Sequence, residues 1–244
     1  KALNPPTEAE NFLRDEFRLA CQARVENADI DIEFAPLNRT PRILTTTAAP
    51  PVAIDPVVTR HGNAVFYADE HIDDYRGHLY GLAIDLGTTT IVLELIDLET
   101  GASVHMSSLE NPQRFGGSDV MNRISYDGQH PNELRRTLVK ALNHEIQQLC
   151  NRYDFVRQEI YEIVVAGNST MRDILFRIDV QGIGQKPYKS QIENEFLEGL
   201  RESTSLTETP RRIGLRANPR ARIYSLPLIA SHVGADVAAD LVAV

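Results

Sequence analysis

The chain has 244 residues, 42% of them hydrophobic, and a formal net charge of −9. This composition is enough for a sizeable core, and it argues against a general nucleic-acid surface, because binding the phosphate backbone depends on clustered Lys and Arg. No apolar stretch approaches the length of a membrane span and no signal peptide opens the chain, so we expect a cytoplasmic protein with neither membrane nor nucleic acid as a partner. The two cysteines, Cys21 and Cys150, predict neither a disulfide framework nor a zinc site.

Residues 1–36 are too few to enclose a core of their own. The segments 17–22 and 29–34 have the composition of strands, and the second alternates regularly. Residues 37–60 are rich in proline, threonine and alanine, which favours an extended linker. The segment 65–67 then predicts a short edge strand, and the charges that follow it, at 69–74, predict a solvated loop.

Residues 81–97 contain the most informative pattern of the chain. Two apolar runs are joined by Asp85, Gly87 and the three threonines at 88–90, and the second run ends at Asp97. Apolar runs of this length are typical of buried strands, and a glycine lets the backbone turn and brings its amides close to a ligand. Hydroxyl and amide donors bind phosphate oxygens, while a carboxylate can hold a metal ion through water. We predict two antiparallel strands joined by a phosphate-binding turn, with an ordinary β-hairpin as the alternative.

The elements that follow alternate between strands and helices. A turn at 99–101 predicts a third antiparallel strand over 103–109. Ser118 is placed to cap a helix, and apolar residues at helical spacing predict a longer helix that starts near Pro131. Next we expect a strand over 159–166, a turn over 167–170 and a short helix over 171–175. An irregular surface excursion over 181–219 follows, and then a strand over 221–226 and a final helix over 234–244.

Four motifs of the chain resemble those of known proteins. Residues 85–90 resemble the first phosphate motif of the acetate-kinase, sugar-kinase, Hsp70 and actin (ASKHA) superfamily, and the predicted order is similar to that of one ribonuclease-H-like lobe (βββαβαβα), which makes the fold class α/β. Together with 85–90, the segments 111–120, 164–171 and 226–236 resemble the reductive activators of corrinoid proteins, which are ATP-dependent iron–sulfur proteins.

The head of the chain agrees with this resemblance. Residues 18–22, around Cys21, are similar to the last cluster-ligand segment of a plant-type [2Fe–2S] ferredoxin domain. The resemblance implies that 1–36 is the C-terminal remnant of that domain, 37–78 a proline-rich linker with an edge strand, and 79–244 the first ASKHA lobe. The three preceding cysteines of the ferredoxin pattern and the second lobe are absent from the sequence. We therefore expect a fragment that is inactive alone, with a [2Fe–2S] cluster in the full-length protein only.

The resemblance also implies roles for single residues. Asp85 is the expected catalytic residue and holds magnesium through water, and Cys21 is a cluster ligand in the intact protein only. The residues expected at the nucleotide are Gly87, Thr88, Thr89, Thr90, Asn168, Thr170 and Asp236.

Several of these residues have a second interpretation. Asp85 can accept hydrogen bonds from turn amides, and Thr90 can simply begin the second strand. Asn168 can cap a helix, and Asp236 can favour the dipole of one. Asn111, which we considered as a phosphate or partner contact with Gln113 and Arg114, is equally explained by an Asn-Pro turn.

The function implied by the resemblance is reductive activation of a corrinoid protein. ATP binding and hydrolysis, with magnesium, would drive electron transfer to cobalt in that partner. The electron donor is not indicated, and a homodimer is left open. Two alternatives are a small-molecule kinase of the same superfamily and a regulatory module that binds nucleotide without turnover.

Overall fold

The computed structural model describes residues 3–7, 18, 23–27 and 54–243, and the chain divides into two compact units, 1–39 and 40–244. In the first unit, Leu3 and Val25 form an isolated antiparallel bridge. Cys21, most of the predicted strand 17–22 and all of the predicted strand 29–34 lie outside the described residues.

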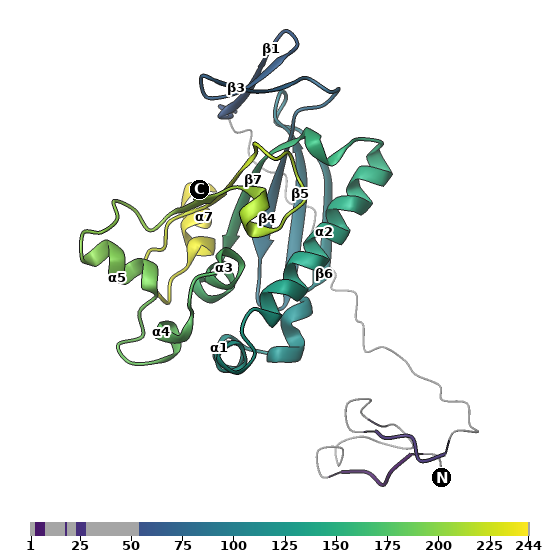
Figure 1. Cartoon of the computed structure of the whole chain (residues 1–244), viewed down its shortest axis with the longest axis vertical. Helices are drawn as coiled ribbons and strands as arrows, with labels where there is room; N and C mark the ends of the chain where they lie inside the picture. Colours follow the sequence, from purple (N-terminus) through teal and green to yellow (C-terminus); the bar gives the residue numbers. More distant parts are fainter. Residues whose placement is uncertain (1–2, 8–17, 19–22, 28–53, 244) are drawn as a thin grey trace. The chain divides into compact units, whose positions relative to one another are not determined.

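The described part of the second unit is built on a mixed six-stranded sheet with the strand order β6-β5-β4-β7-β9-β8 (Figure 1). Strand β4 lies parallel to β7, and β7 lies parallel to β9, whereas the other neighbours are antiparallel. The strands are β4 (Tyr80–Leu86), β5 (Thr90–Asp97), β6 (Ser103–Glu110), β7 (Ile160–Gly167), β8 (Leu206–Glu208) and β9 (Arg222–Ser225).

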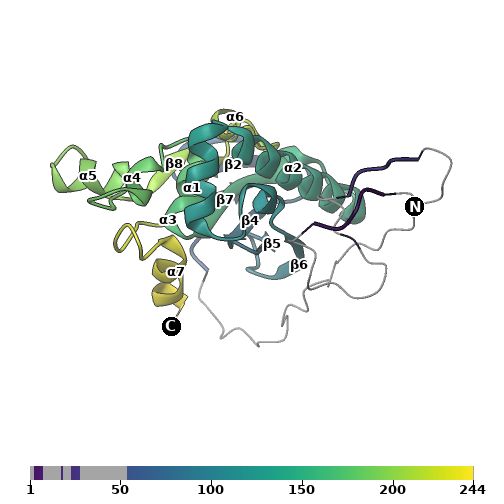
Figure 2. The ribbon, with the colours of Figure 1, turned by 90° about the horizontal axis from the view of Figure 1, so that it is seen from below.

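Helices cover the two faces of this sheet unequally. Figure 2 shows α1 (Val120–Gln129) and α2 (Glu133–Tyr153) on one side of the sheet and α7 (Ala235–Ala243) on the other. Alternate residues of β4 and β5 point to the first side, and α2 places an apolar residue there about once per turn. The buried residues that meet in this core include Leu82, Ile84, Leu86, Ile91, Leu93, Leu95, Leu134, Leu138, Leu142 and Ile146.

Helix α1 begins one residue later than the sequence predicts. Asp119, and not Ser118, is the N-cap, and its side chain accepts a hydrogen bond from the backbone N–H of Asn122. A carboxylate at this position both satisfies a free amide and complements the helix dipole, which explains why it takes the cap from the neighbouring serine.

A second, smaller sheet precedes the large one. Strands β1 (Val58–His61), β2 (Ala64–Tyr67) and β3 (Glu70–Asp74) form an antiparallel meander with its own small core, which includes Tyr161 of β7. The prediction of a solvated loop over 69–74 was therefore wrong. Ile72 is buried between charged neighbours, so the strand was masked by the acidic residues on its exposed face.

The segment 181–219, predicted to be an irregular excursion, contains regular elements. They are α4 (Gln181–Gly184), α5 (Gln191–Leu197), β8 and α6 (Pro210–Ile213), and β8 pairs with β9 at the edge of the large sheet. Each is seven residues or shorter, which is too short for a periodic signal in the sequence. Among the described residues, no helix has the length and apolar character needed to cross a membrane.

Candidate functional site

The predicted phosphate-binding turn lies between β4 and β5, at the carboxyl end of β4. Its tightest point is Gly87, where a Cβ atom would lie 2.4 Å from the backbone oxygen of Thr90. Only glycine fits at such a distance, so the turn requires this residue whatever it binds. Thr89 is exposed and Thr88 half-buried, while Thr90 starts β5, as the second interpretation of that residue expected.

Two buried side chains bind the carbonyl groups of this turn. Asn111 donates from Nδ2 to the carbonyl of Gly87 at 2.8 Å, and its backbone N–H donates to the carbonyl of Thr89 at 2.8 Å. Arg123 of α1, only 1% exposed, donates from Nη2 to the carbonyl of Thr88 at 2.6 Å. With three successive carbonyl oxygens occupied by these donors, the backbone of the turn is fixed.

Arg123 has further contacts that keep it in place. It donates to the carbonyl of Gly117 at 3.1 Å and to Oε1 of Gln113 at 3.4 Å. Burial lowers the pKa of its guanidinium, although the charge of Asp119 acts in the opposite direction. A guanidinium can serve several acceptors in one plane, which suits this position between two loops.

The end of β7 lies beside the turn. Asn168 caps α3 (Ser169–Phe176) by accepting a hydrogen bond from the N–H of Met171 at 3.1 Å, and its Nδ2 donates to Oγ1 of Thr88 at 3.0 Å. The capping interpretation of Asn168 therefore holds together with a direct contact to the turn. The adjacent register pairs Leu86 with Gly167, and this brings the two strand ends together.

Asp85 lies on the face of the sheet opposite α2, where its carboxylate is exposed. No hydrogen bond or ion pair to it is found among the described residues. Partial desolvation, followed by the negative charges of Asp236 and Asp240 on α7, raises its pKa above the ordinary value. A carboxylate that is crowded by like charges and has no internal partner is ready to accept a cation.

Helix α7 reaches this place through a close backbone contact. A Cβ on Gly234 would lie 2.6 Å from Cα of Asn168 and 2.9 Å from the carbonyl oxygen of Gly167. The glycine lets the start of α7 approach the end of β7. Asp236, in the first turn of α7, is thereby brought to the same end of the sheet as Asp85.

Two of the predicted contacts, Thr170 and Arg114, are engaged away from the open side of the turn. Thr170 is only 1% exposed, so the structure does not bring its side chain to the open side of the turn. Arg114 is exposed, where it forms an ion pair with Glu110. Near them, Ser169 and Gln113 are buried and each keeps one polar atom, Oγ and Nε2, without a hydrogen-bond partner.

The residues at this end of the sheet fit a nucleotide with magnesium. The glycine turn offers amides and hydroxyls, and Mg²⁺ needs only one or two carboxylates because it keeps several waters and uses phosphate oxygens. A cluster does not fit here. Within 54–243, no three His, Cys, Asp or Glu side chains are placed to hold a metal ion, and the free thiol of Cys150 is buried.

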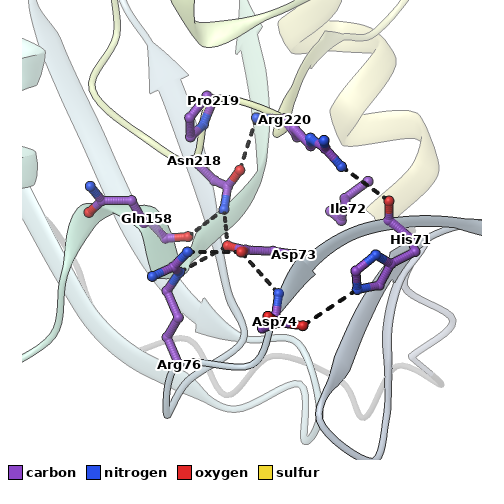
Figure 3. A pocket seen from close by; sticks show the side chains of 9 residues that line it. All are labelled: His71, Ile72, Asp73, Asp74, Arg76, Gln158, Asn218, Pro219 and Arg220. Carbon is purple, nitrogen blue, oxygen red and sulfur yellow. Dashed lines mark hydrogen bonds and ion pairs between the residues drawn. The ribbon is translucent and has the colours of Figure 1, made fainter.

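A cavity of about 450 Å³ opens at the opposite end of the same strands (Figure 3). Asp73 lies at its centre and accepts hydrogen bonds from Arg76 at 2.9 and 3.0 Å, from Asn218 at 2.8 Å and from Tyr161 at 3.2 Å. Desolvation acts to raise the pKa of Asp73, but the hydrogen bonds from Arg76 and Asn218 outweigh it, and the pKa lies below its ordinary value. The Asp73 carboxylate thus connects β3 to the large sheet through its hydrogen bond with Tyr161 of β7.

Sequence reasoning missed Arg123 as a support of the turn, and it left Asn111 between two interpretations. Arg123 had no visible signal, because it lies 35 residues from the Thr88 carbonyl that it contacts and looks like a surface arginine of an amphipathic helix. A signal did exist for Asn111, since Asn-Pro followed by two glycines predicts a tight backbone.

Comparisons with known proteins relate the chain to activators of corrinoid proteins. A family model described as RACo middle region matches residues 80–244. The chain is 32% identical over 168 residues to the corrinoid activation enzyme RamQ of Eubacterium limosum. This match covers 67% of this chain and 26% of that protein. A solved structure, a reductive activator for a corrinoid iron–sulfur protein, is 30% identical with a TM-score of 0.62 and covers 70% of this chain and 26% of its own. The chain thus spans about a quarter of the length of these relatives.

Proposed function

The chain belongs to the RACo middle region family, and we propose that it supplies a nucleotide-binding lobe to an activator that uses ATP to reduce the cobalt of a corrinoid protein. The relatives that it matches are a corrinoid activation enzyme and a reductive activator. The observation that carries the proposal is the fixed glycine turn beside an unpartnered Asp85.

We assign residues 79–244 to the ribonuclease-H-like first lobe of the ASKHA superfamily. The order of three antiparallel strands, then two helices and a parallel strand, supports this assignment. In such a lobe the turn amides and the Thr88 hydroxyl would hold phosphate oxygens at the carboxyl edge of the sheet, where α/β proteins bind ligands. Thr89, which is exposed in the turn, is the second phosphate contact we propose.

Asp85 would act on the metal in this arrangement. Its carboxylate would hold Mg²⁺ through a water molecule, and Asp236 would orient a second water of the same ion. The bound cation would offset the desolvation and the repulsion that raise the pKa of Asp85, so both carboxylates would be ionised in the loaded state.

ATP binding would be coupled to electron transfer through closure of two lobes around the nucleotide. One lobe supplies only one wall of a nucleotide site, so phosphate binding would draw a second lobe onto the turn, and the free energy of closure would favour one conformation of the activator. The described residues of this chain hold no ligand set for an iron–sulfur cluster. We place the cluster in the ferredoxin domain of the full-length protein, where Cys21 would be one of its ligands.

The test is the substitution Asp85→Asn in the full-length protein. It removes one charge with no change of volume, and we expect ATP turnover and ATP-dependent cobalt reduction to fall together by roughly 100-fold or more, while circular dichroism stays unchanged. Phosphate release and the visible spectrum of the corrinoid partner are the two measurements.

Asp69→Asn is the matched control. Asp69 is also an exposed aspartate, but it lies between β2 and β3 of the small sheet and not in the sheet that carries the turn, and its loss should leave both rates unchanged. Unchanged turnover in Asp85→Asn would remove this carboxylate from the mechanism. Phosphate transfer to a small hydroxyl compound, with no effect on cobalt, would favour a kinase instead.

A further inference from the structure

A second cavity, of about 460 Å³, lies next to the one in Figure 3 and shares Pro219 with it. Three arginines line it, Arg157, Arg211 and Arg216, and the remaining lining residues are apolar. All three arginines are exposed, and none of them forms an ion pair with a described carboxylate. In a chain with a net charge of −9, this is an uncompensated positive surface.

The backbone that carries these arginines is fixed by internal hydrogen bonds. Arg216 donates its N–H to Oδ1 of Asn143 on α2 at 2.7 Å, and Nδ2 of the same asparagine donates to the carbonyl of Gly214 at 2.9 Å. On the other wall, Asn218 donates from Nδ2 to the carbonyl of Gln158 at 2.8 Å, next to Arg157. The backbone around the cavity is thus preformed, and the arginine side chains extend from it into solvent.

Two carboxylates close in sequence to the lining arginines, Glu159 and Glu208, are already occupied. Glu159 is 3% exposed and accepts hydrogen bonds from the backbone N–H of His78 at 2.9 Å and of Val156 at 2.8 Å. Glu208 pairs with Arg212 at 3.3 Å, on the turn of α6 beside the cavity. The three lining arginines therefore keep their full capacity to bind an anion from outside.

We propose that this cavity is a docking site for an acidic segment, rich in Asp and Glu, of a partner protein. Guanidinium groups bind carboxylates through two parallel hydrogen bonds, and arginine is enriched at the energetic centres of interfaces. The apolar walls, which include Pro210 and Pro219, provide rigid contact area for the side chains between the carboxylates.

The same features disfavour other occupants. A small phosphorylated molecule would need to be mostly enclosed, with buried polar groups to orient it, whereas the polar lining here consists of exposed arginines. Nucleic acid would require a longer track of cations, and the acidic net charge opposes it. An extended peptide with spaced carboxylates can reach all three arginines from solvent.

The experiment measures binding of a fluorescein-labelled peptide of alternating Glu and Ser to the full-length protein, by fluorescence anisotropy at low ionic strength. We expect the double variant Arg211→Gln, Arg216→Gln to weaken binding at least tenfold. The matched control is Arg136→Gln, Lys140→Gln, which removes two exposed charges from α2 and should change affinity less than twofold. Equal thermal midpoints would show that both variants are folded.

Several outcomes would overturn the proposal. They are no binding of the peptide by the unsubstituted protein, or an equal loss in the control variant. Tighter competition at these arginines by inorganic pyrophosphate or by a short DNA duplex would assign the cavity to a different ligand class. Self-association that disappears in the Arg211, Arg216 variant would assign it to a second copy of the chain.

Discussion

Asp85, near the end of β4 in the large sheet, and Asp73, near the end of β3 in the small sheet, are two carboxylates with opposite surroundings. Asp73 is surrounded by donors from Arg76, Asn218 and Tyr161, and its pKa is lowered. Asp85 has no such donor, faces other carboxylates, and its pKa is raised. The comparison teaches that Asp73 contributes to stability, whereas Asp85 is kept at a cost in stability, which is expected of a group reserved for a ligand.

The comparison predicts opposite effects on stability. Asp73→Ala removes the acceptor of the buried Tyr161 hydroxyl and one of the two acceptors of the buried Asn218 amide, so the free energy of unfolding should fall by about 1.5–3 kcal/mol. Asp85→Asn should instead raise the urea midpoint of the same chain slightly, because it removes repulsion from Asp236 and Asp240. Urea unfolding at pH 7 measures both, and a loss of stability in Asp85→Asn would break the comparison.

The substitution Arg123→Lys tests whether the geometry of the turn depends on the hydrogen bonds that Arg123 donates to its carbonyl groups. Lysine keeps the charge but offers a point donor in place of a planar fork, so it cannot serve the carbonyls of Thr88 and Gly117 together. We expect Arg123→Lys to weaken ATP binding by the full-length protein about tenfold, or about 1.4 kcal/mol, in calorimetric titration. Arg136→Lys, an exposed change on α2, is the control. Equal affinities would show that the turn is rigid without Arg123.

The smallest expected effect is in the pH dependence of stability. The lowered pKa of Asp73 means that the unfolded state binds the proton first, so its stabilisation is present above the ordinary value of 3.8 and is lost as the pH falls through the folded value. The raised pKa of Asp85 has the opposite sign: its contribution is present below 3.8 and is lost as the pH rises through the folded value.

Unfolding free energies measured between pH 3 and 7 separate the contribution of Asp73 from that of Asp85. Asp73→Asn should flatten the acid limb of the profile, and Asp85→Asn should flatten the part above pH 3.8. Identical profiles for the two variants would contradict the assignment of opposite roles.

The sequence predicted the strands best where pattern and burial agree. The strands over 81–97 and the long helix α2 were visible because alternate or helical spacing maps directly onto one buried face. Strand β3 was missed because its exposed face is strongly acidic, and the elements between 181 and 213 because each is too short to show a period.

The candidate site shows the same limit. The glycine, threonines and aspartate of the turn were predicted from their residue types alone. That Asn168 contacts Thr88 follows from the parallel pairing of β4 with β7, which no local pattern encodes. The support by Arg123 depends on where α1 packs, and the burial of Thr170 on the orientation of α3, so both required the structure.

The pairing of β4 with β7 also has a consequence for how the molecule folds. Strands β4, β5 and β6 are neighbours in the chain and can pair through short turns, whereas β7 joins β4 across about 80 residues, as the partners Tyr80 and Ile160 show. Contacts of long sequence separation form late, because closing the intervening loop costs entropy first. We therefore expect the antiparallel strands β4, β5 and β6 to pair early. The nucleotide turn should reach its final geometry only when β7 joins β4, so that ligand binding reports completed folding.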